Sequence, residues 1–265
     1  MKKVVLVTGA SSGLGEALAT ILAQKGYTVY GTSRKPGAES RFTLLAMDVQ
    51  DAASVQAAVA QIIAEQGQID VLINNAGVGI AGPLEVTSIE SIQQAFDTNV
   101  FGLVRVSQAV LPHMRKAESG KIINISSIAS EVALPYRALY SATKASVDRI
   151  TESLRLEVGR FGIQACAIQA GDIQTAITAH RIMEYAADHP AYGEVFAKVA
   201  QKMNDGVSKG SSAQFMASEI IKILEKPTLK KIYPVGKTYQ KLSLTLKKLL
   251  PAGLFEKVIK GYTQS

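Results

Sequence analysis

Residues 4–15 read VVLVTGASSGLG, a run of four apolar residues followed by a glycine-rich turn. Consecutive apolar residues are typical of a parallel strand that is covered on both faces. Glycines in such a turn let the backbone approach a pyrophosphate, and a helix starting there directs free N–H groups at the phosphates. Three residues separate the first two glycines, unlike the commonest dinucleotide fingerprint, so an ordinary glycine-rich turn is the alternative. The stretch favours a nucleotide site with the candidate contacts Gly9, Ser11, Ser12, Gly13, Leu14 and Gly15.

The rest of the chain continues this alternation of strand and helix. Strand-like runs occur at residues 4–8, 28–32, 43–47, 71–74, 121–125, 163–168 and 231–234. Helix-like segments occupy residues 13–24, 52–65, 89–116, 138–159 and 213–224. Within the segment 138–159, Val147, Ile150, Leu154 and Val158 recur at steps of three and four, which places them on one helical face. The alternation predicts an α/β fold with a parallel sheet covered on both faces by helices.

Two regions depart from this rhythm. Residues 172–210 are too long for a structureless loop, so we expect a substrate lid with short helices. Residues 237–265 form a basic, leucine-rich extension that Pro251 and Gly253 interrupt. We therefore predict one domain over residues 1–236, which includes the lid, followed by a helical extension over residues 237–265.

Composition and charge limit the classes of function. The segment 222–265 holds ten Lys and two Glu, a balance of +8, whereas the remainder holds 19 basic and 20 acidic residues. The body is thus nearly neutral, which argues against nucleic-acid binding. One cysteine excludes a disulfide framework and a multi-cysteine metal site, and we expect no metal ion. No signal peptide or membrane span is expected, and we expect a cytoplasmic protein.

The end of the second strand indicates which dinucleotide is bound. A carboxylate at this place selects NAD by binding the ribose 2′-hydroxyl. This chain has Ser33 and Arg34 instead, and a guanidinium can bind a 2′-phosphate with two hydrogen bonds. We therefore expect NADP(H), with a solvated surface arginine as the alternative. Asp48 and Val49 follow the third strand, where Asp48 could bind the adenine amino group or cap the helix that begins near Ala52.

The decisive pair is Tyr140 and Lys144, four residues apart on a predicted helix and therefore on one face. An ammonium beside a phenol stabilises the phenolate, which suits the phenol to proton transfer. Ser127 ends the fifth strand, where its hydroxyl could hold a substrate oxygen. A Tyr/Lys pair alone is more often structural than catalytic, so the catalytic interpretation of this pair depends on the other motifs.

Together these motifs resemble the short-chain dehydrogenase/reductase family. The resemblance rests on residues 8–15, Asn74-Asn75-Ala76-Gly77, Asn99, Ser127 and the pair Tyr140-x-x-x-Lys144, and it covers about residues 3–176. It implies a doubly wound seven-stranded Rossmann sheet, usually assembled as a dimer or tetramer. It also implies that Tyr140 transfers the proton, that Lys144 assists it and holds the nicotinamide ribose, and that Ser127 orients the carbonyl. Asn99 is similar to the residue that supports a water-linked proton relay.

The resemblance extends to further cofactor contacts. Asn75, Ala76 and Gly77 are expected to run beneath the cofactor, and Gly171, Ile173 and Thr175 to approach the nicotinamide carboxamide. One departure is Ala170-Gly171, where the family usually has Pro-Gly. The chain is thus expected to be an NADP(H)-dependent alcohol dehydrogenase or carbonyl reductase acting on a small, rather apolar ketone, aldehyde or alcohol. The long lid and extension resemble those of steroid- and retinol-type members.

Three alternatives stay open at this point. A non-catalytic NADPH sensor could keep the fold, and a 3-oxoacyl-carrier-protein reductase would use a basic surface to attract its acidic carrier. The extension could be a terminal helix with a solvated lysine face, or it could cap the pocket or pack against another subunit. It could also contact an anionic membrane peripherally, since basic amphipathic segments do so.

Overall fold

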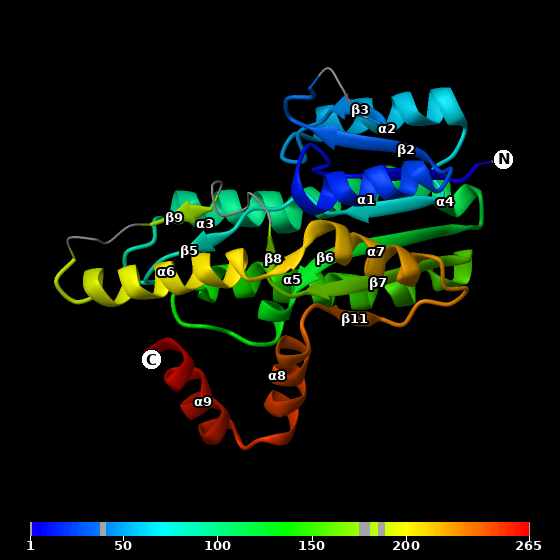
Figure 1. The fold of residues 1–265 in the computed structure, drawn as a ribbon. Coiled ribbons are helices and arrows are strands. Elements are labelled where there is room, and N and C mark those ends of the chain that lie inside the picture. The colour runs from blue at the N-terminus through cyan, green and yellow to red at the C-terminus, as the bar shows by residue number, and fades with distance from the viewer. Residues whose placement is uncertain (1, 38–40, 175–180, 185–188, 265) are drawn as a thin grey trace.

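The computed structural model describes residues 2–37, 41–174, 181–184 and 189–264. Seven strands form one parallel sheet in the order β11-β7-β6-β4-β1-β2-β3 (Figure 1). The strands are β1 (Val4–Val7), β2 (Thr28–Ser33), β3 (Thr43–Ala46), β4 (Val71–Asn74), β6 (Gly120–Ser127), β7 (Ile163–Ala170) and β11 (Ile232–Val235). The predicted seven-stranded doubly wound sheet is confirmed. Its order reverses between β1 and β4, and in open α/β sheets ligands bind at that point, beyond the carboxyl ends of the strands.

Helices cover both faces of the sheet. The helices are α1 (Gly13–Gln24), α2 (Ala52–Gln66), α3 (Ile89–Phe96), α4 (Gly102–Lys116), α5 (Ala138–Val158), α6 (Gly193–Ser208), α7 (Ala213–Leu224), α8 (Thr238–Leu249) and α9 (Ala252–Gln264). One apolar cluster joins α1 and α7 to the sheet, and a second joins α2, α4 and the end of α5 to its opposite face. This two-sided burial explains why the strands read as continuous apolar runs.

Local signals set the helix boundaries. The Asp51 carboxylate accepts a hydrogen bond from the backbone N–H of Ala53 (2.9 Å), and α2 ends at Gly67, whose φ is +78°. The sequence left open whether Asp48 caps this helix; Asp51 is the cap, because it directly precedes the first helical residue. None of the helices in the described ranges is long and apolar enough to cross a membrane.

The segment expected to be helical over residues 89–116 is helical throughout. It contains a feature that the sequence did not predict: a π-helical turn, η1 (Asp97–Phe101), lies between α3 and α4. A π turn adds one residue to a helical turn but leaves the segment as apolar as before. The spacing of apolar residues in the sequence therefore does not reveal it. Such turns often lie at functional sites, and this one contains Asn99.

The region expected to form a lid contains two short strand pairings and one long helix. β8 (Ile173–Gln174) pairs with β10 (Ser211–Ser212), and β5 (Ile80–Ala81) pairs with β9 (Ile182–Met183). α6 follows over 16 residues, longer than the short helices we expected. The break predicted at Pro251 occurs there, between α8 and α9, whereas the break predicted at Gly253 does not, because Gly253 lies within α9.

Cys166 lies in the centre of β7 and is fully buried. Burial raises the pKa of its thiol to about 12, so the reactive thiolate is absent at neutral pH. We expect the native protein to leave a thiol-reactive disulfide reagent unconsumed at pH about 8, where a free cysteine reacts. The same protein in denaturant should consume one equivalent per chain, and rapid consumption by the native protein would contradict this burial.

Candidate active site

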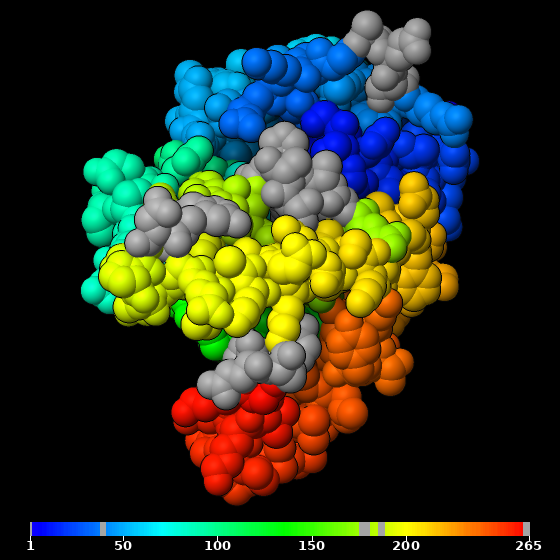
Figure 2. All heavy atoms as spheres, turned by 60° about the vertical axis from the view of Figure 1, so that its left-hand side comes forward, coloured from blue at the N-terminus to red at the C-terminus, as the bar shows by residue number. Residues whose placement is uncertain are grey.

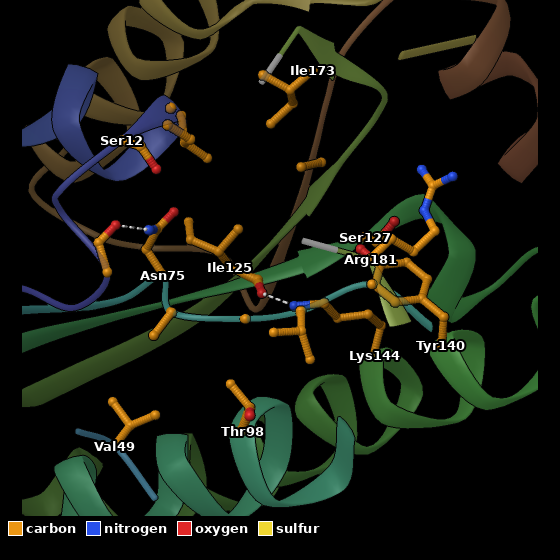
Figure 3. A pocket seen from close by; sticks show the side chains of 18 of the residues that line it. Ser12, Val49, Asn75, Thr98, Ile125, Ser127, Tyr140, Lys144, Ile173 and Arg181 are labelled. Atoms are coloured by element: carbon orange, nitrogen blue, oxygen red, sulfur yellow. Dashed lines mark hydrogen bonds between the residues drawn. The ribbon is translucent and has the colours of Figure 1, made fainter. Parts of the chain in front are cut away.

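A cavity of about 450 Å³ opens beyond the carboxyl ends of the central strands. Its walls come from the turns that follow β1, β2, β4, β6 and β7, and from α5. In Figure 3, Ser12 and Asn75 lie at one end of the cavity, and Ser127, Tyr140 and Arg181 lie at the other. The fold thus brings the glycine turn and the Tyr/Lys pair, 125 or more residues apart in the chain, to one elongated cavity.

The glycine turn shapes the first end of the cavity. Ser11, Ser12, Gly13 and Leu14 line it, and Ser12 precedes α1 without a side-chain hydrogen bond to the helix N-terminus. The first N–H groups of α1 are therefore open to an anion. Gly9 has a φ of +66°, and a Cβ on it would lie 2.9 Å from Cα of Ala76. A backbone cradle of this kind fits the pyrophosphate of a dinucleotide.

Gly15 contributes differently from the other residues of the motif. It lies outside the residues that line the cavity, and a Cβ on it would lie 2.1 Å from the carbonyl oxygen of Gly9. Gly15 therefore permits α1 to pack against the turn, and it does not itself face the ligand. In glycine turns that bind dinucleotides, the third glycine has this packing role.

Asn75 holds the glycine turn against the end of β4. Its Nδ2 donates to the carbonyl oxygens of Thr8 and Gly9, both at 3.0 Å, and Figure 3 draws one of these bonds. The backbone N–H groups of Asn75 and Ala76 donate to Oγ1 of Thr8 at 3.0 and 2.9 Å. Asn75, Ala76 and Gly77 all line the cavity, so this segment forms part of its wall as expected.

Ser33, Arg34, Asp48 and Val49 line the cavity beyond the ends of β2 and β3. The Arg34 side chain is exposed, which leaves its guanidinium available to a ligand. The Asp48 carboxylate accepts from the backbone N–H of Gln50 at 2.9 Å, which fixes its orientation at the cavity wall. The structure therefore brings all four predicted residues of this end together.

Lys144 and Tyr140 lie on the face of α5 that borders the cavity. Lys144 is 6% exposed, and its Nζ donates to the carbonyl oxygen of Ile125 at 2.9 Å (Figure 3). The same Nζ lies 5.9 Å from the centre of the Tyr140 ring. The Ile125 carbonyl uses one of the three ammonium donors, which leaves two for a group bound in the cavity.

Ser127 stands opposite this pair at the end of β6. Its Oγ accepts from the backbone N–H of Ala129 at 3.1 Å, at the start of the short turn η2 (Ile128–Ser130). The hydroxyl hydrogen of Ser127 is not used in that bond, so it can be donated to a group in the cavity.

Asn99 lies one layer behind the cavity wall. Its Oδ1 accepts from the backbone N–H of Val78 at 2.7 Å, and its Nδ2 donates to the carbonyl of Val78 at 2.9 Å and to Oγ1 of Thr143 at 3.1 Å. The side chain thus ties the π turn to the segment after β4 and to α5. It is 2% exposed and is not among the residues that line the cavity.

The turn after β7 closes the remaining side. Gly171 and Ile173 line the cavity, whereas the predicted contact Thr175 lies outside the described residues. Asp172 accepts from Nε2 of Gln240 at 2.8 Å, so the first turn of α8 braces this wall. A Cβ on Gly171 would lie 2.2 Å from Oε1 of Gln240, which shows how closely the two segments pack.

Two arginines at the Tyr140 end were not predicted. Arg137 and Arg181 line the cavity, and the guanidinium carbon of Arg137 lies 5.1 Å from the centre of the Tyr140 ring. Burial lowers the pKa of the Arg181 guanidinium and the charge of Arg137 lowers it further, whereas Tyr140 and Asp172 oppose the shift. Arg137 could have been found from its position three residues before Tyr140, but Arg181 carries no local sequence signal.

The whole arrangement can bind a dinucleotide and transfer a proton. The glycine cradle and the open helix N-terminus suit a pyrophosphate, and Arg34 lines the cavity beyond the end of β2. Among the described residues, no group of three or more His, Cys, Asp or Glu side chains could hold a metal ion. The polar side chains at the Tyr140 end include the phenol of Tyr140, the ammonium of Lys144, the hydroxyl of Ser127 and the two arginines.

Known proteins share both the sequence and the fold. A 3-ketodihydrosphingosine reductase from Bacteroides thetaiotaomicron is 41% identical over 256 residues, which is 96% of this chain and 95% of that protein. Human 17-beta-hydroxysteroid dehydrogenase type 1 is 32% identical over 235 residues, which is 76% of this chain and 70% of that protein.

Solved structures agree with these relatives. A short-chain dehydrogenase from Streptomyces avermitilis superposes with a TM-score of 0.81 at 28% identity, over 99% of this chain and 95% of that one. ElxO with NADP bound superposes with a TM-score of 0.73 at 27% identity, over 89% of this chain and 97% of that one. The family described as short chain dehydrogenase matches residues 3–185. The chain belongs to the short-chain dehydrogenase family of oxidoreductases.

Proposed function

We propose that this oxidoreductase uses NADP(H) to interconvert a carbonyl and an alcohol on a largely apolar small molecule, with Tyr140 as the general acid and base. The observation that carries the proposal is the position of Tyr140 and Lys144 in the cavity that also contains the glycine turn. A proton donor beside a dinucleotide site is the arrangement that hydride exchange with a carbonyl requires.

Tyr140, Ser127 and Lys144 each have a distinct part in the proposed reaction. When bound, NADPH supplies the hydride that reaches the carbonyl carbon. Tyr140 donates its proton to the carbonyl oxygen, and Ser127 donates a hydrogen bond to the same oxygen. Lys144 stabilises the resulting phenolate through an ammonium N–H that Ile125 does not use. Tyr140 then regains a proton from water, and the reverse sequence oxidises the alcohol.

Asn99 acts in this proposal as a positioning residue. Both polar atoms of its side chain are engaged by Val78, and Nδ2 also reaches Thr143, the neighbour of Lys144. These bonds hold α5 at a fixed distance from the segment after β4. These contacts support a role for Asn99 in fixing the position of Lys144. A water-linked proton relay could then run through the Lys144 ammonium.

The names of the relatives support an apolar substrate with a secondary alcohol or ketone. The bacterial relative reduces 3-ketodihydrosphingosine by its name, and the human relative acts on a steroid. We propose 3-ketodihydrosphingosine and related long-chain ketones as the first substrates to test. We also propose that the enzyme is cytoplasmic and, as family members commonly are, a homodimer or homotetramer.

The direct test is NADPH consumption followed by absorbance with a panel of long-chain ketones, steroid ketones, simple aldehydes and a 3-oxoacyl thioester. We expect turnover with at least one apolar ketone, and the preferred ketone identifies the substrate class. Tight NADPH binding without turnover of any compound would contradict the proposal and favour a sensor.

Arg34 provides the test of cofactor preference. Arg34→Ala should raise the KM for NADPH by roughly 10- to 100-fold, because a charge-assisted contact contributes about 1.5–3 kcal/mol. The KM for NADH should change little, since NADH lacks the 2′-phosphate. Steady-state kinetics with both cofactors measures the effect, and Arg160→Ala in η3 (Gly159–Phe161), at the amino end of β7, is the matched control. Equal changes for the two cofactors would show that Arg34 does not contact a 2′-phosphate.

A further inference from the structure

The two C-terminal helices form a hairpin that stands apart from the sheet. Figure 1 shows α8 and α9 below the body of the molecule, and Figure 2 shows the last segment as a projecting lobe. One face of the hairpin is fixed to the segment around η2 by an apolar cluster with Leu244 and Phe255 at its centre. The cluster also contains Ile128, Val132, Leu134, Leu246, Leu250 and Ile259.

The remaining surface of the hairpin carries exposed apolar side chains. Leu242 is 52% exposed and Leu249 is 74% exposed, and they lie two helical turns apart on the side of α8 opposite the buried Leu244. On α9, Leu254 and Val258 are each 49% exposed and one turn apart. Single exposed leucines are ordinary, but a stripe on each helix of a projecting hairpin is a typical interaction surface.

Lysines lie beside these apolar stripes. Lys241 and Lys248 are exposed and precede Leu242 and Leu249 directly, and the exposed Lys257 precedes Val258. The segment 222–265 has a balance of +8, while the rest of the chain has a balance of −1. The hairpin itself, residues 238–264, holds five of these lysines and one glutamate, a balance of +4.

Exposed leucines beside lysines favour an anionic bilayer as the partner over a second copy of the chain or a nucleic acid. A second copy of the chain would bring two strongly positive hairpins together, and like charges across an interface repel. A nucleic acid would pair with the lysines but would leave the leucines exposed to water. An anionic bilayer accepts both, since apolar side chains enter the acyl boundary while lysines reach the headgroups.

We propose that the outer face of α8 and α9 binds the surface of an anionic lipid bilayer and holds the enzyme there as a peripheral protein. Gln240, in the first turn of α8, binds Asp172 at 2.8 Å, and Asp172 lines the catalytic cavity. Binding through the hairpin therefore keeps this wall of the cavity close to the bilayer. If the proposed function holds, an apolar ketone dissolved in the bilayer has a short path to Tyr140.

The test is flotation of the full chain with phosphatidylcholine vesicles and with vesicles that also contain phosphatidylglycerol. We expect binding to the mixed vesicles to exceed binding to neutral vesicles by roughly tenfold or more, and to fall as salt is added. The double variants Leu242→Ser/Leu249→Ser and Lys241→Gln/Lys248→Gln should each lose most of this binding. Leu156→Ser on α5, where Leu156 is 80% exposed, and Lys198→Gln on α6 are the matched controls.

Separate measurements distinguish this proposal from the catalytic one. All four variants should retain the wild-type melting temperature and turnover of a water-soluble ketone, because the substituted side chains are exposed and none of them lines the cavity. Equal flotation with neutral and anionic vesicles, or wild-type flotation of both double variants, would overturn the proposal that the hairpin binds an anionic bilayer. A change of oligomeric state in the double variants, seen by light scattering, would also overturn it in favour of a contact between copies.

Discussion

Tyr140→Phe is expected to lower kcat by roughly 100- to 10,000-fold, because the substitution removes only the hydroxyl that donates and accepts the proton. The ring remains, so its contacts with Arg137 and with the wall of the cavity should persist. The dissociation constant for NADPH, measured by fluorescence titration, should change by less than about threefold, an effect below 1 kcal/mol. The variant therefore separates chemistry from cofactor binding.

The matched control for this experiment is Tyr27→Phe. Tyr27 lies just before β2, at the amino end of the sheet and far from the cavity, so its kinetics should equal those of the wild type. Wild-type kcat in Tyr140→Phe would show that another group transfers the proton. If weaker NADPH binding accounted for the whole loss of activity in Tyr140→Phe, Tyr140 would contribute to cofactor binding and not to proton transfer.

Among Gly→Ala substitutions in the glycine turn, Gly15→Ala is expected to lower the free energy of unfolding the most. The new Cβ would lie 2.1 Å from the carbonyl oxygen of Gly9 and 2.5 Å from Nδ2 of Asn75. Both neighbours are fixed, since Asn75 is bound to the backbone of Thr8 and Gly9. Overpacking against such atoms costs about 3 kcal/mol or more, which lowers Tm by roughly 10 °C in a domain of this size.

Gly159→Ala is the matched control, because no atom lies within 4 Å of a Cβ on Gly159 and its φ is −57°. Alanine there should leave Tm unchanged or raise it slightly. Scanning calorimetry with and without NADPH measures both variants, and Gly15→Ala should also show a much smaller rise on NADPH addition. A Gly15→Ala protein as stable as the wild type would contradict the close packing of α1 on the turn.

The sheet could be predicted from the sequence because its strands are buried on both faces. Burial on both faces requires consecutive apolar residues, so runs such as Val4–Val7 and Val71–Asn74 are visible without any alignment. The Tyr140 and Lys144 pair was predictable for a similar reason, since a spacing of four places two side chains on one helical face.

Other features depend on contacts between distant segments. The Ile125 carbonyl that orients Lys144 comes from β6, and the Val78 backbone that engages Asn99 follows β4. Arg181 reaches the cavity because β9 pairs with β5, which is a two-residue contact between segments about a hundred residues apart. No periodicity marks these contacts, because each depends on the packed arrangement and not on a local pattern.

In the proposed reaction, NADPH bound beside Tyr140 and Lys144 gives its hydride to a carbonyl carbon. The most direct measurement uses NADPH that carries deuterium at both C4 positions of the nicotinamide, with the best ketone found in the substrate panel, followed by mass spectrometry of the alcohol. We predict that deuterium appears on the carbinol carbon in the same amount as NADPH is consumed, and that Tyr140→Phe forms almost none of this product. Consumption of NADPH without deuterium in the alcohol, or equal labelling by Tyr140→Phe, would contradict the account.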